Sequence, residues 1–278
     1  MKLGDLEFHC LSDGHIYLDG GAMFGIVPKP LWEKRTPADS RNRIRLGLNC
    51  VLIYAGGKRI LVETGAGGKF DQKRRDIYRL DGPRLDAHLR EYAIAPGDID
   101  IVVNTHLHFD HCGGNTRLEK DKIVPVFPNA RYVIRKGEYK NATHVNERTR
   151  ATYFAENFAP LEAAGQLQLV ESDTEIVPGV ELICAPGHTA DMQCVKLSGG
   201  GKTAFLLADL VPTTAHLPLA WGMGYDLFPL IVLENKRKWL PRIAAEEWIS
   251  LFVHDPDVPA AYLRERDGAF VPEPVKID

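Results

Sequence analysis

The stretch "NTHLHFDHCGGN", which runs from Asn104 to Asn115, brings four potential metal-binding side chains into six residues: His106, His108, Asp110 and His111. The whole chain has 10 histidines, so three within one short segment are a strong local concentration. Imidazole is the commonest metal ligand in proteins, and carboxylates join it readily at zinc and iron sites. The segment therefore predicts a metal site, and the alternative is a chance cluster on a surface loop.

The residues around this segment place it at the end of a strand. The preceding run "IDIVV" (99–103) is apolar and β-branched, which indicates a buried strand. α/β proteins place their chemistry at the carboxyl ends of strands. The two-residue spacing of the first two histidines puts both on one face of an extended segment. The acid and histidine that follow require a turn, which Gly113 and Gly114 would permit.

Length and composition are those of an ordinary globular protein. The 278 residues suit one large α/β domain, and we expect a single domain over residues 1–278. Apolar residues make up 45% of the chain and charged residues 26%, which provides for an ample core. The formal net charge of −3 argues against a dedicated nucleic-acid surface, because such a surface needs a basic face.

The cysteines and the N-terminal residues bear on location. Five cysteines without close pairing argue against a disulfide framework and fit a reducing compartment. The start "MKLGDLEFHC" lacks the apolar core of a signal peptide, and no apolar run approaches the ~20 residues that span a bilayer. We therefore expect a cytoplasmic protein without membrane association, with a homodimer as the default assembly.

The pattern along the chain predicts a mixture of strands and helices. The segment 47–68 predicts a β-hairpin around Gly56 and Gly57. Helical segments are predicted at 84–94, 146–164 and 230–247, and further strands at 131–135, 167–170, 180–186, 194–197, 203–209 and 248–254. This mixture indicates an α/β or α+β fold, with two sheets packed face to face and helices outside.

Three more candidate ligands each follow a predicted strand. His188 comes after the run that ends in "ICAP", Asp209 ends "FLLAD", and His254 ends "LFVH". A lone histidine or aspartate after a strand is usually only a turn residue or a helix cap. Three of them downstream of the histidine-rich segment instead indicate that several strand ends converge on one metal centre.

Taken in order, "THLHFDH", "PGHT", "AD" and "VHD" resemble the motifs of the metallo-β-lactamase-fold hydrolases. The resemblance spans the chain from the glycine-rich hairpin to His254. It implies a four-layer αββα sandwich with a dinuclear metal site between the edges of its sheets. It assigns the ligands in two sets that are bridged by Asp209: His106, His108 and His188 for one ion, and Asp110, His111 and His254 for the other.

The resemblance also implies the chemistry of the centre. Two divalent cations would activate a shared water for hydrolysis. The expected metal is zinc, and the alternatives are iron, manganese and cobalt. Asp110 lies near the nucleophile in this scheme and is the candidate proton shuttle to the leaving group. No cysteine nucleophile is required, so we expect Cys112, beside His111, to be a small packed thiol.

One position departs from the family pattern. Family members carry Asp-Thr-Gly or Asp-Ala-Gly after the second hairpin strand, whereas this chain has Glu63-Thr64-Gly65. In the family, that carboxylate orients a ligand histidine through a hydrogen bond. Glu63 can accept the same hydrogen bond, but its side chain reaches one methylene further.

Within the superfamily, four stretches are similar to the YtnP-like branch of N-acyl-homoserine lactone lactonases: 18–35, 126–130, 208–213 and 225–229. This similarity implies hydrolytic opening of a lactone ring, quorum quenching, and a small-molecule substrate with an apolar acyl or aromatic group. The first stretch holds Met23, Phe24 and Trp32, which form either an apolar wall over the metals or a buried packing segment.

The better-studied lactonases carry a tyrosine three residues after the bridging aspartate, where this chain has Pro212. The candidates to replace that tyrosine in positioning the substrate carbonyl are Thr213, Thr214, His216 and Tyr225. The sequence alone does not indicate which of the four takes this role. For His216, the alternative is an ordinary histidine on the surface.

Two other functions compete with this interpretation. A phosphotriesterase or arylesterase like methyl parathion hydrolase would share all seven ligands and an aromatic pocket. A non-catalytic binding protein on the same fold belongs to a different class, but such proteins usually lose ligands. Comparison of lactone and organophosphate substrates separates the first alternative, and metal analysis separates the second.

Overall fold

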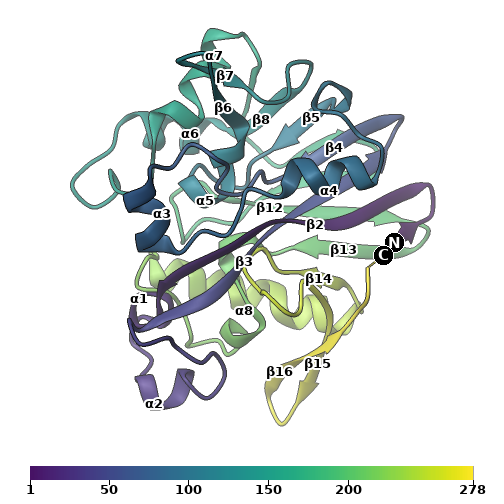
Figure 1. The fold of residues 1–278 in the computed structure, drawn as a ribbon. Coiled ribbons are helices and arrows are strands. Elements are labelled where there is room, and N and C mark those ends of the chain that lie inside the picture. The colour runs from purple at the N-terminus through teal and green to yellow at the C-terminus, as the bar shows by residue number, and fades with distance from the viewer. Residues whose placement is uncertain (278) are drawn as a thin grey trace.

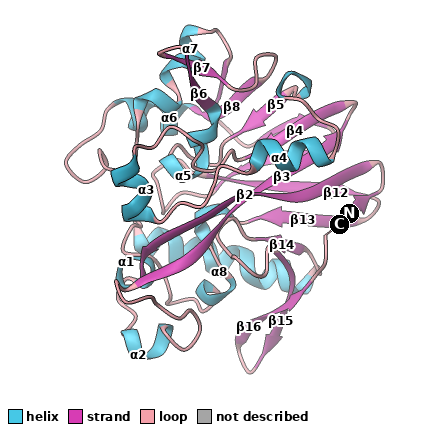
Figure 2. Cartoon of the chain, viewed as in Figure 1, coloured by secondary structure: helices cyan, strands magenta, loops and turns pink. Residues whose placement is uncertain are grey.

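Two seven-stranded sheets form the framework of the computed structural model, which describes residues 1–277 (Figures 1 and 2). The first sheet contains, in spatial order, β1 (Lys2–Leu3), β2 (Leu6–Asp19), β3 (Arg43–Ala55), β4 (Lys58–Val62), β5 (Ile101–Val103), β8 (Arg131–Arg135) and β9 (Leu167–Val170). The second contains β10 (Thr174–Val177), β11 (Val180–Cys184), β12 (Gln193–Gly199), β13 (Lys202–Leu206), β14 (Ile249–Leu251), β15 (Ala260–Arg266) and β16 (Ala269–Pro274). A separate hairpin pairs β6 (Thr116–Glu119) with β7 (Lys122–Pro125).

Helices connect the strands and cover the outer faces of the sheets (Figure 2). They are α1 (Gly20–Phe24), α2 (Lys29–Trp32), α3 (Gln72–Tyr78), α4 (Leu85–Glu91), α5 (Phe109–Cys112), α6 (Lys136–Thr143), α7 (Ala159–Ala163) and α8 (Pro229–Ala245). Short 3-10 turns lie at Pro96–Asp98, Gly113–Asn115, Ala155–Asn157, Ala208–Leu210 and Thr214–His216.

The side chains of β4 alternate between two apolar cores. Ile60 and Val62 belong to the core that the two sheets share, whereas Leu61 packs into a second core with Leu89 of α4. Successive side chains of a strand point to opposite faces, so a strand that is covered on both faces reads as an unbroken apolar run. This explains the β-branched runs in the sequence, and it places one layer of helices outside the first sheet.

Helix α8 covers the outer face of the second sheet. The ring of Phe205 on β13 stacks on Trp239 of α8, with 4.9 Å between ring centroids. Leu240 and Ile243 of the same helix are fully buried in the same core. Helices therefore lie outside both sheets, which confirms the predicted αββα sandwich.

Most of the expected elements are present. The hairpin at 47–68 is β3 and β4, the helix at 84–94 is α4, and the helix at 230–247 is α8. The helix predicted over 146–164 is wrong, because only Ala155–Asn157 and α7 are helical there. At its start, the Asn146 side chain accepts hydrogen bonds from the backbone N–H groups of residues 148 and 149, at 2.9 Å and 3.2 Å, as a helix N-cap does, but only a turn follows. Pro160 then restricts the residue before it and begins α7 anew.

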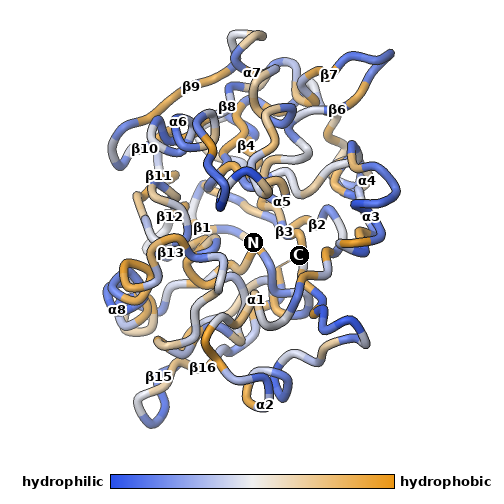
Figure 3. The backbone as a smooth tube through the Cα atoms, turned by 90° about the vertical axis from the view of Figure 1, so that its left-hand side faces the viewer, coloured by the Kyte–Doolittle hydropathy of each residue, from blue (hydrophilic) through white to orange (hydrophobic). Residues whose placement is uncertain are grey.

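Two structures at the chain ends were not predicted. The 14-residue strand β2 is interrupted by a bulge between Ser12 and His15, where Gly14 has φ of 109°, so its apolar alternation is broken. The C-terminal hairpin of β15 and β16 turns at hydrophilic residues, which Figure 3 shows in blue.

Two further observations concern the described residues. Between residues 1 and 277, no helix combines the length and the apolar character needed to cross a membrane. The five cysteines all carry free thiols.

Candidate metal centre

The histidine-rich segment forms a loop and one short helix at the carboxyl end of β5. His108 precedes α5, which contains Asp110 and His111. The two glycines that follow serve a close approach and not a left-handed turn, because Gly113 has φ of −60°. A Cβ on Gly113 would lie 2.2 Å from the Ala66 carbonyl oxygen, and a Cβ on Gly114 would lie 2.2 Å from that of Thr64. The segment is therefore locked against the loop that follows β4.

Three histidines from two loops form the first ligand group. The Nδ1 atom of His108 lies 3.1 Å from Nε2 of His106 and 3.0 Å from Nε2 of His188. All three side chains are buried. His188 reaches them from the loop that follows β11, so the two sheets together build this group.

The second group joins the histidine-rich segment to the end of β14. The Nε2 atoms of His111 and His254 lie 3.0 Å apart. The Oδ2 atom of Asp110 is 3.6 Å from the His254 nitrogen and 4.0 Å from the His111 nitrogen. These three ligand atoms lie within 4.8 Å of one another, as do those of the first group.

Asp209 lies between the two groups, with one carboxylate oxygen toward each. Its Oδ2 atom is 3.2 Å from Nε2 of His188 in the first group. Its Oδ1 atom is 3.3 Å from Nε2 of His254 and 3.5 Å from Nε2 of His111 in the second group. This is the placement that a bridging carboxylate requires, and all seven predicted ligands thus converge.

The second ring nitrogen of most of these histidines is held by a neighbour. Nδ1 of His188 donates to Oδ1 of Asp226 at 3.0 Å, and Nδ1 of His254 donates to the Gly47 carbonyl oxygen at 2.9 Å. Nδ1 of His106 lies 3.0 Å from the hydroxyl of Thr105. Such contacts fix the tautomer and leave the Nε2 lone pair free for a metal.

Glu63 occupies the position where the sequence departs from the family pattern. Its Oε1 atom accepts a hydrogen bond from the Thr105 backbone N–H at 3.0 Å and lies 3.5 Å from Nδ1 of His111. The residue has a left-handed backbone, with φ of 66°. The longer side chain thus still reaches the ligand histidine, and it also ties the end of β4 to the segment after β5.

Charges within the centre compensate one another. Burial would raise the pKa of Asp209, but His254, His111 and His188 outweigh it and hold that pKa well below its usual value. Burial lowers the pKa of His106 and of His108 far below the usual value, and the neighbouring histidines lower it further. His106 and His108 therefore present neutral imidazoles beside an ionised carboxylate, whereas the carboxylates of Asp209 and Asp226 raise the pKa of His188 despite its burial.

These residues fit two divalent cations. Imidazole nitrogens that face one another at 3.0 to 3.1 Å direct lone pairs into a shared space, which a cation fills. The buried Oδ1 atom of Asp209 has no hydrogen-bond partner within residues 1–277. A set of imidazoles and carboxylates suits zinc, iron, manganese or cobalt.

A cavity of about 160 Å³ opens onto the centre. Five of the seven ligands line it, and the rest of its wall is mainly apolar or aromatic: Leu18, Met23, Tyr78, Phe109, Ala151, Thr152, Met223 and Tyr225. Ligand pockets have this character, in which apolar walls surround a few convergent polar groups. The cavity is therefore the place where a substrate can meet the metals.

The structure divides the residues that the sequence suggested for substrate binding. Met23 and Tyr225 line the cavity. Phe24 is fully buried between Trp32 and His216, with ring centroids 5.3 Å and 4.5 Å away, and none of these three is among the lining residues. The segment 18–35 therefore serves both alternatives, since Leu18 and Met23 line the cavity while Phe24 and Trp32 form a core.

His216 and Thr213 support the cavity wall from behind. His216 is buried, so the surface alternative is wrong. Its Nε2 atom donates to the Met23 carbonyl oxygen at 2.8 Å, and its Nδ1 atom lies 2.8 Å from the Thr213 hydroxyl. Burial lowers the pKa of His216 to about 4, so the ring is neutral near pH 7.

Cys112 is packed as expected. Its thiol is fully buried and donates to the Leu107 carbonyl oxygen at 3.3 Å. Burial raises the pKa of this thiol, and a protonated, enclosed thiol is a poor nucleophile.

Sequence reasoning missed Asp226. This buried carboxylate orients His188 with one oxygen and accepts the Met223 backbone N–H with the other at 2.8 Å. It lies in the stretch 225–229, which was noted only for its family resemblance. No local spacing links it to a histidine 38 positions earlier.

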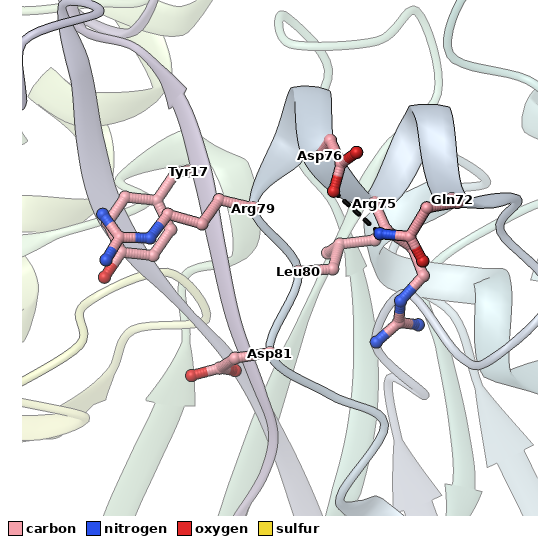
Figure 4. A pocket seen from close by; sticks show the side chains of 7 residues that line it. All are labelled: Tyr17, Gln72, Arg75, Asp76, Arg79, Leu80 and Asp81. Atoms are coloured by element: carbon pink, nitrogen blue, oxygen red, sulfur yellow. Dashed lines mark hydrogen bonds between the residues drawn. The ribbon is translucent and has the colours of Figure 1, made fainter.

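A second hollow, which Figure 4 shows, is formed by α3, the segment that follows it and Tyr17 of β2. It is lined by Tyr17, Gln72, Arg75, Asp76, Arg79, Leu80 and Asp81. The Arg79 guanidinium lies over the Tyr17 ring at 4.5 Å, and Gln72 donates to Asp76 at 2.8 Å. These groups engage one another, and none of them is among the seven predicted metal ligands.

Comparisons with known proteins agree with this fold and centre. The model of the metallo-beta-lactamase superfamily matches residues 44–254. The N-acyl homoserine lactonase AiiA of Bacillus thuringiensis subsp. kurstaki is 28% identical over 228 residues, which cover 76% of this chain and 82% of the relative. A crystal structure described as a probable metal-dependent hydrolase from Staphylococcus aureus has a TM-score of 0.91 at 31% identity and covers 100% of both chains. AidC, a dizinc quorum-quenching lactonase solved with its product, has a TM-score of 0.84 at 22% identity, over 100% of this chain and 97% of AidC.

An αββα sandwich with a two-part histidine and carboxylate centre defines a class of metal-dependent hydrolases. The chain belongs to the metallo-beta-lactamase superfamily, whose model covers most of its length. It is a metal-dependent hydrolase, and its paired ligand groups fit a dinuclear centre.

Proposed function

We propose that the protein hydrolyses N-acyl-homoserine lactones, using a metal pair held by the seven ligands described above. One observation carries this proposal: the cavity is lined both by metal ligands and by mainly apolar or aromatic side chains. An acyl-homoserine lactone has the matching chemistry, with a polar ester at one end and an apolar chain at the other. The lactonases of Bacillus thuringiensis among the relatives support the same substrate class.

The reaction adds water across the ester bond of the ring. When bound, two divalent cations would lower the pKa of a water and polarise the ester carbonyl oxygen. The hydroxyl from water becomes bonded to the carbonyl carbon, the ring C–O bond breaks, and the departing oxygen takes a proton. Asp110 is the residue to carry this proton, because its carboxylate lines the cavity and its side chain keeps 10% exposure within the centre.

Tyr225 is the residue that best fits the role of the missing tyrosine. Among the four candidates Thr213, Thr214, His216 and Tyr225, it alone lines the cavity. Burial and the nearby carboxylates of Asp19 and Asp110 raise its pKa to about 12, which keeps its phenol protonated. A protonated phenol can donate a hydrogen bond to the substrate carbonyl or to the amide of the acyl chain.

The apolar wall suits an acyl chain. The Phe109 ring lines the cavity and packs against Tyr78 and Phe70, with ring centroids 5.0 Å and 5.3 Å away. Met23 and Met223 add flexible thioether side chains, which adapt to ligands of different shape. Longer chains should therefore gain binding energy from this wall, at roughly 0.8 kcal/mol for each buried methylene.

The test is acid release measured in a pH-stat with zinc-loaded protein. The substrates are a short-chain and a long-chain acyl homoserine lactone, with paraoxon as the rival substrate. Rapid lactone opening that is lost in His106→Ala, while paraoxon is left intact, is the expected result. Paraoxon hydrolysis without lactone opening, in protein that holds its full metal content, would reject the lactonase proposal in favour of a phosphotriesterase.

A further inference from the structure

Glu138 is a carboxylate buried directly behind the first ligand group. It lies in the first turn of α6, immediately after β8, and its side chain is fully buried. Burial of a charged carboxylate is unfavourable unless hydrogen-bond donors surround it. The position of Glu138 therefore depends on the hydrogen-bond donors that surround its carboxylate.

The donors that surround Glu138 come from three separate segments. Its Oε1 atom accepts from the Leu107 backbone N–H at 3.0 Å and from the Tyr153 hydroxyl at 2.9 Å. Its Oε2 atom accepts from the Thr189 hydroxyl at 2.6 Å. One carboxylate thereby joins the histidine-rich loop, the loop after β11 and the segment before α7.

Each of these donors adjoins a ligand of the first group. Leu107 lies between His106 and His108 in the chain, and Thr189 follows His188. The Tyr153 ring packs against His108, with ring centroids 4.9 Å apart. The hydrogen bonds of Glu138 therefore bear on all three histidines of the first group and on no ligand of the second.

We propose that Glu138 is the positioning residue of the three-histidine metal site, fixing the spacing of its two ligand loops before the metal binds. This inference rests on the assignment of the metal ligands and not on the choice of substrate. Preorganisation of this kind acts on metal affinity, and the loss of an outer partner typically weakens metal binding 10- to 100-fold.

The variants differ in how many acceptors they keep. Glu138→Gln keeps one oxygen acceptor but turns an N–H donor toward Leu107 N–H or toward the Thr189 hydroxyl. Glu138→Leu removes every acceptor at similar volume. Tyr153→Phe removes a single donor and serves as the mild variant that folds if the others do not.

Asp13 provides the matched control. It is equally buried and accepts backbone N–H groups of Gly67, Arg84 and Leu85 at 3.0 to 3.1 Å, and none of these three is adjacent to a ligand. Asp13→Asn thus reports what the loss of a buried carboxylate does to the fold in general. Its effect on stability is measured by urea unfolding beside the Glu138 variants.

The readout is stepwise zinc affinity, measured by competition with a chromophoric chelator. We expect one of two zinc ions to bind about tenfold more weakly in Glu138→Gln and about 100-fold more weakly in Glu138→Leu, with the other ion within about twofold. Tyr153→Phe should show a loss of a few fold at the same ion. In a His188→Ala background, where the first site is already broken, Glu138→Gln should leave the remaining ion unchanged.

Two results would overturn the proposal. One is wild-type affinity for both ions in Glu138→Leu or, if that variant does not fold, in Tyr153→Phe. The other is an equal loss at both ions that Asp13→Asn reproduces, because a general loss of stability would then explain it. Loss of zinc binding in His106→Ala tests the ligand assignment separately, so failure of the positioning role and failure of the metal site are distinguishable.

Discussion

His216 offers a test of how the cavity wall is supported, through the pH dependence of stability. The ring is 1% exposed, stacks on Phe24, and bridges the Met23 carbonyl oxygen and the Thr213 hydroxyl. Its neutral tautomer can donate at Nε2 and accept at Nδ1, which satisfies both neighbours. His216→Gln keeps one donor and one acceptor on an amide of comparable reach but removes the titration.

The magnitude follows from the pKa of the ring. Burial lowers the pKa of His216 from the ordinary 6.5 to about 4. Between these values the unfolded chain binds a proton that the folded protein does not, so the free energy of unfolding rises with pH and is lost on acidification. The full difference is about 3.4 kcal/mol, of which about 2 kcal/mol is lost by pH 5 and about 3 kcal/mol by pH 4.

The assay is urea unfolding of zinc-loaded wild type and His216→Gln at pH values from 7 to 4. Acidification also protonates the metal ligands, but it does so in both proteins, so the difference between them isolates His216. We expect the wild type to lose about 2 kcal/mol more than the variant between pH 7 and pH 5. Parallel curves for the two proteins would refute a buried, neutral His216.

Three further predictions concern the centre and the cavity. Asp209→Asn should impair both zinc binding and turnover, because a neutral amide replaces the bridging carboxylate; wild-type rates would remove Asp209 from that role. Met23→Ala should raise KM for long-chain lactones more than for short-chain ones, since Met23 lines the cavity, whereas Phe24→Ala should chiefly destabilise the fold, by about 3–5 kcal/mol in urea unfolding. If Phe24→Ala raised KM for long-chain lactones and Met23→Ala instead lowered the stability, the assignment of Met23 to the cavity wall would be wrong. Asp226→Asn should weaken zinc binding about tenfold, because the amide can satisfy only one of its two donors, His188 and the residue 223 N–H; full zinc content at limiting zinc would contradict this.

Local patterns were sufficient for much of the fold. The strands β4, β5 and β13 are short and covered on both faces, so their β-branched and apolar runs are legible in the sequence. Helix α8 is long enough for its apolar spacing to be unambiguous. Local patterns failed at 146–164, where only a turn follows Asn146 and Pro160 begins a separate short helix, and at β2, where the bulge at residues 12–15 shifts the alternation.

The ligands themselves were accessible from the sequence because metal chemistry restricts residue type and strand ends restrict position. Four of the ligands lie within six consecutive residues, so their spacing alone predicted a shared site: His106, His108, Asp110 and His111. His188, Asp209 and His254 each end an apolar run, which is a weaker signal that only their combination made useful.

The residues that hold the metal ligands in place could be identified only from the tertiary structure. Glu138 contacts Leu107 and Thr189 across 31 and 51 positions of the chain, and Asp226 contacts His188 across 38. The division of the segment 18–35 into two cavity residues, Leu18 and Met23, and a buried core likewise depends on where the loop before α8 packs. The sequence does not distinguish a buried carboxylate from a solvated one. Whether a carboxylate orients a metal ligand depends on how distant segments pack around it. The sequence by itself thus specified which side chains can bind metal, while the tertiary structure decided how they are held and which residues the substrate meets.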